Sequence, residues 1–234
     1  MKIKDFLKDK KVIFYGDSIT HNWLKYTHDL EKVANYDGKS MSGYTGIILK
    51  ETMTKSIENF AVSGGCYADT SSFTERQVFR HFPYQIDNSL LKLKDADVIF
   101  VFFGTNDYSS QTPFGRYDEL LPAKDSRTFY SGMNYGFNKI KEVNPKAKVF
   151  VLTLLNRTCP IDVDTFTYSL NEYNLAIKHN AKRFGFQIID ISSLFKLEDN
   201  FPNGKGPIYS DDGLHPNELG HKVLAEFILN SEVK

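Results

Sequence analysis

The sequence predicts an α/β fold of three layers, in which a parallel sheet lies between two layers of helices. Five short runs of apolar, β-branched and aromatic residues recur along the 234 residues, and several are apolar at every position instead of at alternate positions. Such runs are typical of strands covered on both faces. Segments with helical spacing separate the later runs, which indicates right-handed crossovers and a doubly wound sheet. We expect one domain over residues 1–234, since this length commonly forms a single α/β domain.

The five expected strands each have a clear start or end. The first, residues 11–15, is apolar or aromatic after its initial lysine, and the second, residues 56–62, ends before a pair of glycines. The third, residues 97–103, contains the longest purely apolar run and ends at a glycine. The fourth and fifth, residues 148–155 and 187–191, each follow a segment with helical spacing. Their β-branched and aromatic residues favour strands.

Four segments have the apolar pattern of amphipathic helices. Residues 83–94 and 126–143 carry their apolar side chains on one side: Ile86, Leu90, Leu91 and Leu93 in the first, and Phe129, Met133, Phe137 and Ile140 in the second. Residues 165–184 and 217–229 repeat the pattern with Leu170, Tyr173, Leu175, Ile177 and Ala181, and with Val223, Leu224, Phe227 and Ile228. We expect Asp125 or Ser126 to cap the second helix and Gly185 to end the third.

The composition argues against several classes of protein. Lysine plus arginine and aspartate plus glutamate each total 29, so no net charge favours nucleic acid or an anionic membrane as a partner. No apolar run is long enough to span a bilayer. Residues 1–11 lack the apolar segment of a secretory signal, so we expect a cytoplasmic protein, while an earlier trimming of a secreted precursor stays open. The sequence does not indicate an oligomeric state.

The two cysteines do not form a recognisable site. Cys66 and Cys159 have no neighbours at metal-ligand spacing, so we expect no metal. Their strands lie about three positions apart in the expected sheet, roughly 14 Å, which favours thiols over a disulfide. The loop after the first strand also lacks the glycine-rich patterns that bind dinucleotides or phosphates, so we expect no flavin or nucleotide cofactor.

Candidate reactive residues gather at one edge of the expected sheet. In doubly wound folds the loops after the carboxyl ends of the strands meet in one crevice. Ser18, Gly64, Asn106 and Asn156 each follow an expected strand by a few residues, and His215 can return to the same edge from the last loop. This edge is therefore the place to look for chemistry.

Ser18 and the pair formed by Asp212 and His215 have the chemistry of a hydrolase. Ser18 follows the first strand at the start of a helical turn, where backbone N–H groups favour negative charge. Asp212 and His215 are three residues apart in a turn, which lets the carboxylate orient the imidazole, and the imidazole can then take a proton from a serine hydroxyl. Each has an alternative use, as a helix cap or as surface turn residues. Asp211 is an alternative orienting carboxylate, and His21 is an alternative base close to Ser18.

Two further motifs supply hydrogen-bond donors. The glycines at 64 and 65 allow the backbone to take positive φ values and to approach a ligand closely. Asn106 places a carboxamide directly after the third strand. Taken singly, both patterns are also those of ordinary turns. Cys66 is a rival nucleophile, although a small buried cysteine is the commoner role.

In order and spacing, these motifs resemble the four blocks of the SGNH (GDSL-type) hydrolase superfamily. The blocks are Gly16 to Thr20, Asn59 to Gly64, Gly104 to Asp107 and Asp212 to Pro216, so the resemblance covers almost the whole chain. It implies a five-stranded parallel sheet of flavodoxin-like topology and a catalytic triad that needs no metal. Ala61 is a departure, since many members have glycine there.

The resemblance also implies a role for each matching residue. Ser18 would be the nucleophile, His215 the general base and then acid, and Asp212 the residue that orients His215. The oxyanion hole would consist of the backbone N–H groups of Ser18 and Gly64 and the side-chain amide of Asn106. Asp17 and Asp107 would brace the turns.

We therefore expect a serine esterase that works through an acyl-enzyme, with a short acyl group such as acetyl and a small-molecule or carbohydrate ester as substrate. Trp23, Tyr44 and Tyr108 are candidates for contact with a sugar ring or an alkyl chain. Lysophospholipase or thioesterase activity on longer chains, O-acyl transfer to a sugar hydroxyl, and carbohydrate binding without catalysis are the alternatives.

Overall fold

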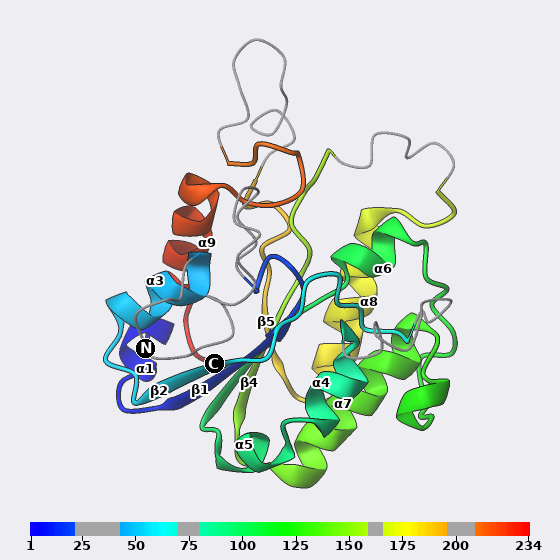
Figure 1. The fold of residues 1–234 in the computed structure, drawn as a ribbon, viewed down its shortest axis with the longest axis horizontal. Coiled ribbons are helices and arrows are strands. Elements are labelled where there is room, and N and C mark those ends of the chain that lie inside the picture. The colour runs from blue at the N-terminus through cyan, green and yellow to red at the C-terminus, as the bar shows by residue number, and fades with distance from the viewer. Residues whose placement is uncertain (22–42, 70–79, 159–165, 196–208) are drawn as a thin grey trace.

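The computed structural model describes residues 1–21, 43–69, 80–158, 166–195 and 209–234, and these form one five-stranded sheet with helices on both faces (Figure 1). All strands are parallel, and their order is β2-β1-β3-β4-β5. The strands are β1 (Lys11–Gly16), β2 (Ser56–Asn59), β3 (Val98–Phe102), β4 (Lys148–Leu152) and β5 (Gln187–Ile189). The prediction of a flavodoxin-like α/β fold is confirmed.

The strand order decides where the connections between strands diverge. Phe14 of β1 pairs with Asn59 of β2 on one side and with Phe100 of β3 on the other. The chain therefore winds outward from β1 in both directions, and the crossovers diverge at its carboxyl end. Ser18 follows β1 at this point.

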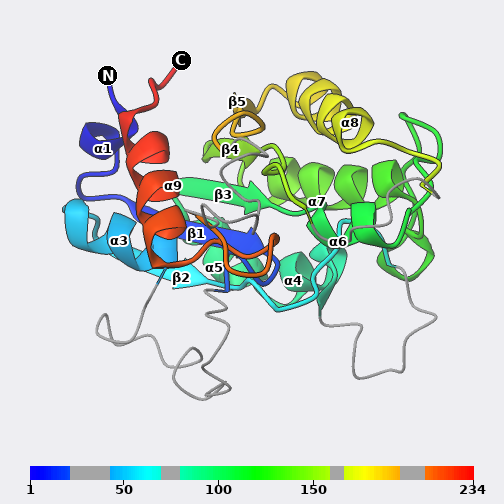
Figure 2. The same ribbon diagram turned by 90° about the horizontal axis from the view of Figure 1, so that it is seen from above.

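The helices divide between the two faces of the sheet, as Figure 2 shows from above. One face carries α1 (Ile3–Phe6), α3 (Gly43–Glu51) and α9 (Glu218–Asn230). The other carries α4 (Phe82–Asp87), α5 (Leu90–Asp95), α7 (Phe129–Val143) and α8 (Leu170–Arg183). The short helix α6 (Thr105–Ser109) follows β3 at the carboxyl edge of the sheet. In the described part of the chain, no helix is long and apolar enough to cross a membrane.

Aromatic side chains fill the core on both faces of the sheet. On the face covered by α3, Phe14, Phe100 and Phe150 stack across three adjacent strands, with ring centroids 4.8 and 5.0 Å apart. On the opposite face, Tyr15 meets Phe82 of α4 at 5.9 Å. Because the inner strands β1, β3 and β4 are buried on both faces, their residues are apolar at nearly every position, which is the pattern that predicted them.

The expected helix at 83–94 is instead two helices, α4 and α5, separated at Asn88 and Ser89. Ser89 Oγ lies 2.6 Å from the Gln85 carbonyl oxygen and 2.6 Å from the hydroxyl of Tyr15. A serine side chain bonded in this way competes with the helical backbone pattern. The break also turns Leu90 and Leu91 outward, and Leu91 is 86% exposed, so the predicted apolar side is wrong for these two residues.

The other three helices were predicted, but their starts and some of their apolar sides differ. Thr128 caps α7 through a reciprocal capping box with Ser131, so the prediction of Asp125 or Ser126 as the cap is wrong. Ser169 and Glu172 form the corresponding box of α8, which therefore begins at Leu170 instead of 165. Leu175 of α8 and Phe227 of α9 are exposed, so the predicted apolar sides are wrong for these two residues.

Candidate active site

Ser18, His215 and Asp212 form a continuous hydrogen-bonded chain at the carboxyl end of β1. Ser18 Oγ lies 2.9 Å from Nε2 of His215, and Nδ1 of His215 lies 2.8 Å from Oδ2 of Asp212. Ser18 and His215 are 197 positions apart in the sequence. The structure thus brings together the three residues that the sequence selected.

The turn that carries Ser18 is fixed from both sides. The N–H of His21 donates to the carbonyl oxygen of Asp17 at 2.8 Å, which closes one helical turn around Ser18. Asn59 Nδ2 donates to the Thr20 carbonyl oxygen at 2.8 Å and ties the turn to the end of β2. His215, rather than His21, is the imidazole at the serine hydroxyl.

The loop before α9 folds around the carboxylate of Asp212. Its Oδ1 accepts hydrogen bonds from the N–H groups of Leu214 and His215, at 2.9 and 2.7 Å, and from Ser210 Oγ at 3.2 Å. Partial burial raises the pKa of Asp212, but the hydrogen bonds from His215 and Leu214 outweigh it and hold the pKa well below its usual range. An ionised Asp212 keeps the proton of His215 on Nδ1, which leaves Nε2 free to accept a proton from Ser18.

Asp211, the alternative orienting residue, has a different environment. Its side chain is exposed and lies 3.3 Å from Nδ2 of Asn217, the cap of α9. Asp212 is therefore the carboxylate that meets His215.

A hydrogen bond joins the loops after β2 and β3, which carry the predicted oxyanion donors Gly64 and Asn106. Gly64 has a φ of 79°, which is the left-handed conformation predicted from the presence of glycine at this position. Asn106 Nδ2 donates to the carbonyl oxygen of Gly65 at 2.9 Å. Because an amide nitrogen carries two protons, this bond fixes the side chain of Asn106 and leaves its second proton for a ligand.

Two buried carboxyl groups brace these turns from below. Asp17 Oδ1 accepts from the N–H of Ile19 at 2.9 Å, and Asp107 accepts from the N–H groups of Tyr67 and Ala68 at 2.9 and 3.2 Å. Both side chains are fully buried. Burial raises the pKa of each to about 7, although the hydrogen bonds from the backbone act in the opposite direction.

Raising the pH from about 5 to about 8 is expected to lower the free energy of unfolding. A carboxyl group with a pKa of about 7 in the folded chain and about 3.9 in the unfolded chain binds its proton more tightly in the folded state. The stability it contributes is full below about pH 4 and is lost as the pH rises through about 7. Urea unfolding at several pH values measures the loss.

Asp107→Asn should flatten this pH dependence, because it removes one of the two buried carboxyl groups whose pKa is raised. The same substitution at the exposed Asp118 is the matched control and should leave the slope unchanged. A slope that is identical in wild type and Asp107→Asn would show that Asp107 is ionised in the folded protein throughout this range.

The aromatic residues proposed from the sequence as substrate contacts are core residues where the structure describes them. Tyr44 is fully buried, its hydroxyl lies 3.0 Å from Thr20 Oγ1, and its ring stacks on His221, so the expectation of a substrate contact is corrected. Tyr108 is only 6% exposed and packs against Phe166. Trp23 lies outside the described residues.

Cys66 is buried behind the glycine turn, with Sγ 3.7 Å from the carbonyl oxygen of Gly64, whereas Cys159 lies outside the described residues. Within the described ranges, no three His, Cys, Asp or Glu side chains are grouped as metal ligands.

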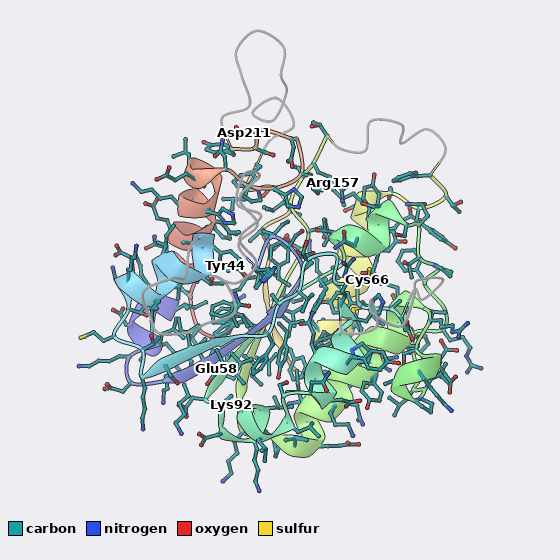
Figure 3. The ribbon with its side chains drawn as sticks, viewed as in Figure 1. Tyr44, Glu58, Cys66, Lys92, Arg157 and Asp211 are labelled. Carbon is teal, nitrogen blue, oxygen red and sulfur yellow. The ribbon has the colours of Figure 1, made fainter. Side chains whose placement is uncertain are left out.

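The sequence reasoning missed Arg157, which directly follows Asn156 after β4. Asn156 itself does not enter the site, since its Nδ2 donates to the Phe195 carbonyl oxygen at 2.9 Å. Arg157 Nη1 donates to the Thr105 carbonyl oxygen at 2.8 Å, and Nη2 donates to Ser109 Oγ at 2.9 Å. In Figure 3, Arg157 lies near the top of the view, far from Lys92 at the bottom. The one sequence signal that could have identified Arg157 is its position just after the fourth expected strand, at the edge of the sheet where the candidate reactive residues gather.

Comparisons with known proteins agree with this fold. The family model of the GDSL-like lipase/acylhydrolase family matches residues 14–223. Among solved structures, a protein from Lactobacillus plantarum is 21% identical, with a TM-score of 0.67 over 94% of this chain and 95% of that chain. A catalytic mutant of an acetylxylan esterase from Geobacillus stearothermophilus is 18% identical, with a TM-score of 0.60 over 95% of this chain and 93% of that chain. At these low identities, the structural similarity shows a shared fold. No curated protein matches the chain.

Proposed function

Since the chain belongs to the GDSL-like lipase/acylhydrolase family and is an ester-hydrolysing enzyme, we propose that it is a serine esterase that uses Ser18, His215 and Asp212 as its triad. The observation that carries this proposal is the hydrogen-bonded chain from Ser18 Oγ through His215 to Asp212 Oδ2, with links of 2.9 and 2.8 Å. A serine hydroxyl is a weak nucleophile unless a neighbouring base accepts its proton. His215 is placed to do so.

In the first half of the proposed reaction, Ser18 Oγ attacks the carbonyl carbon of the ester and His215 Nε2 takes the hydroxyl proton. The carbonyl oxygen becomes an oxyanion, which the N–H groups of Ser18 and Gly64 and the amide of Asn106 stabilise. His215 then gives its proton to the departing alcohol oxygen as the carbon–oxygen bond breaks. The acyl group remains on Ser18.

In the second half, water attacks the acyl carbon while His215 Nε2 removes one of its protons. The second oxyanion accepts hydrogen bonds from the same donors, and this tetrahedral intermediate breaks down as the bond to Ser18 breaks. His215 returns its proton to Ser18 Oγ, and the carboxylic acid leaves. Asp212 stays ionised during both halves and stabilises the imidazolium form of His215.

We propose a short acyl group, with an acetylated carbohydrate as the preferred class of substrate. The structural likeness to an acetylxylan esterase supports this choice, at 18% identity. The equal numbers of acidic and basic residues, 29 of each, fit a neutral substrate better than a highly charged one.

A series of p-nitrophenyl esters tests the acyl group directly. We expect kcat/KM to be highest for acetate and to fall as the acyl chain lengthens, because a short-acyl pocket excludes longer chains. Ser18→Ala is measured beside wild type, to subtract hydrolysis that does not depend on the site. A preference for eight carbons or more would contradict the acetyl proposal and favour a lysophospholipase or thioesterase.

A further inference from the structure

Arg157 lies in the segment between helix α6, which carries Asn106, and the loop that carries Asp212 and His215. Its guanidinium donates to the Thr105 carbonyl oxygen at 2.8 Å and to Ser109 Oγ at 2.9 Å, and it lies 5.5 Å from the centre of the Tyr108 ring. All three partners belong to α6, the helix that carries Asn106. Arg157 thus contacts α6 on both sides of Asn106 in the sequence.

Helix α6 needs such support because it is short. It contains 5 residues and follows Gly104, whose φ is 113°. A helix of this length has few internal hydrogen bonds and little stability of its own. The Thr105 carbonyl belongs to the peptide group that joins Thr105 to Asn106, so the bond from Arg157 restrains the backbone directly before the oxyanion donor.

The residue after Arg157 reaches the other part of the site. The N–H of Thr158 donates to the carbonyl oxygen of Gly213 at 2.9 Å, in the loop between Asp212 and His215. The segment Asn156 to Thr158 therefore connects α6 to the loop that holds the base. A displacement of this segment would change the distance between the oxyanion donor and the imidazole.

The positive charge of Arg157 also acts on Asp17, one of the two buried carboxyl groups. Burial raises the pKa of Asp17, whereas the N–H of Ile19, the charge of His215 and the charge of Arg157 lower it. Because Asp17 directly precedes Ser18, the charge of Arg157 acts on the residue next to the nucleophile.

We propose that Arg157 is a positioning residue, which holds α6 so that the amide of Asn106 meets the oxyanion at the correct distance from His215. This inference rests on the proposed serine esterase function. Arginine suits the role because its planar guanidinium holds its donors in a fixed geometry, whereas the lysine ammonium is a compact charge on a flexible stem.

A double-mutant cycle of Arg157→Met and Asn106→Ala, measured with p-nitrophenyl acetate, tests the proposal. Asn106→Ala alone should lower kcat by roughly a hundred- to a thousandfold. Arg157→Met alone should lower kcat by at least about tenfold, since small displacements in a site have large effects on rate, with KM changed by less than about threefold. Added to Asn106→Ala, Arg157→Met should cost less than about threefold further, because a residue that acts through Asn106 has little left to affect.

Two additional variants and a second readout make the result unambiguous. Arg157→Lys keeps the charge and should recover only part of kcat; it also replaces Arg157→Met in the cycle if that variant does not fold. Arg116→Met is the matched control, because the Arg116 side chain is 80% exposed and pairs only with its near neighbour Asp118 in the described structure; it should leave kcat unchanged. The rate at which a fluorophosphonate labels Ser18 gives the same cycle without depending on the acyl group.

Equal losses from Arg157→Met in the wild-type and Asn106→Ala backgrounds would overturn the inference while leaving the esterase proposal intact. Full recovery of kcat by Arg157→Lys would also overturn it, since charge alone would then suffice. A folded wild-type protein that neither hydrolyses p-nitrophenyl esters nor reacts with the fluorophosphonate would refute the proposed function, and the role of Arg157 with it.

Discussion

Ser18→Ala is expected to lower kcat by roughly 10⁴- to 10⁶-fold while leaving the fold intact. The substitution removes the oxygen that lies 2.9 Å from Nε2 of His215 and that would form the acyl-enzyme. The remaining activity would come from the oxyanion donors and from substrate binding, which act without the nucleophile. Alanine is smaller than serine and fits the same turn, so circular dichroism and thermal unfolding should match those of wild type.

The control for this experiment is Ser110→Ala, which makes the same chemical change at an exposed serine just after α6. It should have wild-type kcat. Cys66→Ala tests the rival nucleophile and should also retain activity, since the thiol is buried. A folded Ser18→Ala variant that turns over at the wild-type rate would exclude a serine mechanism centred on Ser18.

Asp212→Asn is expected to lower kcat by about 10⁴-fold, although it changes a single atom of the side chain. Oδ1 of Asp212 accepts hydrogen bonds from the N–H groups of Leu214 and His215, and these donors require an oxygen at that position. The amide nitrogen of asparagine would therefore face Nδ1 of His215. An N–H there donates to Nδ1 and moves the imidazole proton to Nε2, which can then no longer accept the proton of Ser18.

The neighbouring residue provides a control with the same substitution. Asp211→Asn changes an exposed carboxylate that does not contact His215 and should retain wild-type kcat. Comparable losses in the two variants would mean that both carboxylates contribute to the base, and a loss in Asp211→Asn alone would assign the orienting role to Asp211 instead.

The sheet could be predicted closely because its signal is local and redundant. The inner strands β1, β3 and β4 are buried on both faces and are therefore apolar at nearly every position, a pattern that can be recognised from the sequence alone. The helices were predicted less well at their ends. Several residues before α7 can act as an N-cap, and Thr128 is the one used because Ser131 completes the box with it. The break at Ser89 depends on Tyr15, a residue of a distant strand.

The candidate site likewise combines contacts between residues close in the sequence, which could be predicted, with contacts between distant segments, which could not. Asp212 and His215 are three residues apart, so their contact could be inferred from the spacing alone. The support given by Arg157 could not be inferred, since it arises where the segment after β4 packs on the helix after β3. The prediction for Tyr44 was wrong for a related reason: this aromatic residue becomes a core residue once α3 packs on the sheet.

The separation of 197 positions between Ser18 and His215 has a consequence for how the enzyme matures. When a chain is synthesised from its N-terminus, the imidazole of His215 is added 197 residues after the nucleophile. Closing so long a loop is entropically costly, and contacts of this kind tend to form late in folding. A nascent or truncated chain that ends before residue 215 therefore carries the serine without its base. The proposed esterase activity therefore requires synthesis and folding of the chain beyond residue 215.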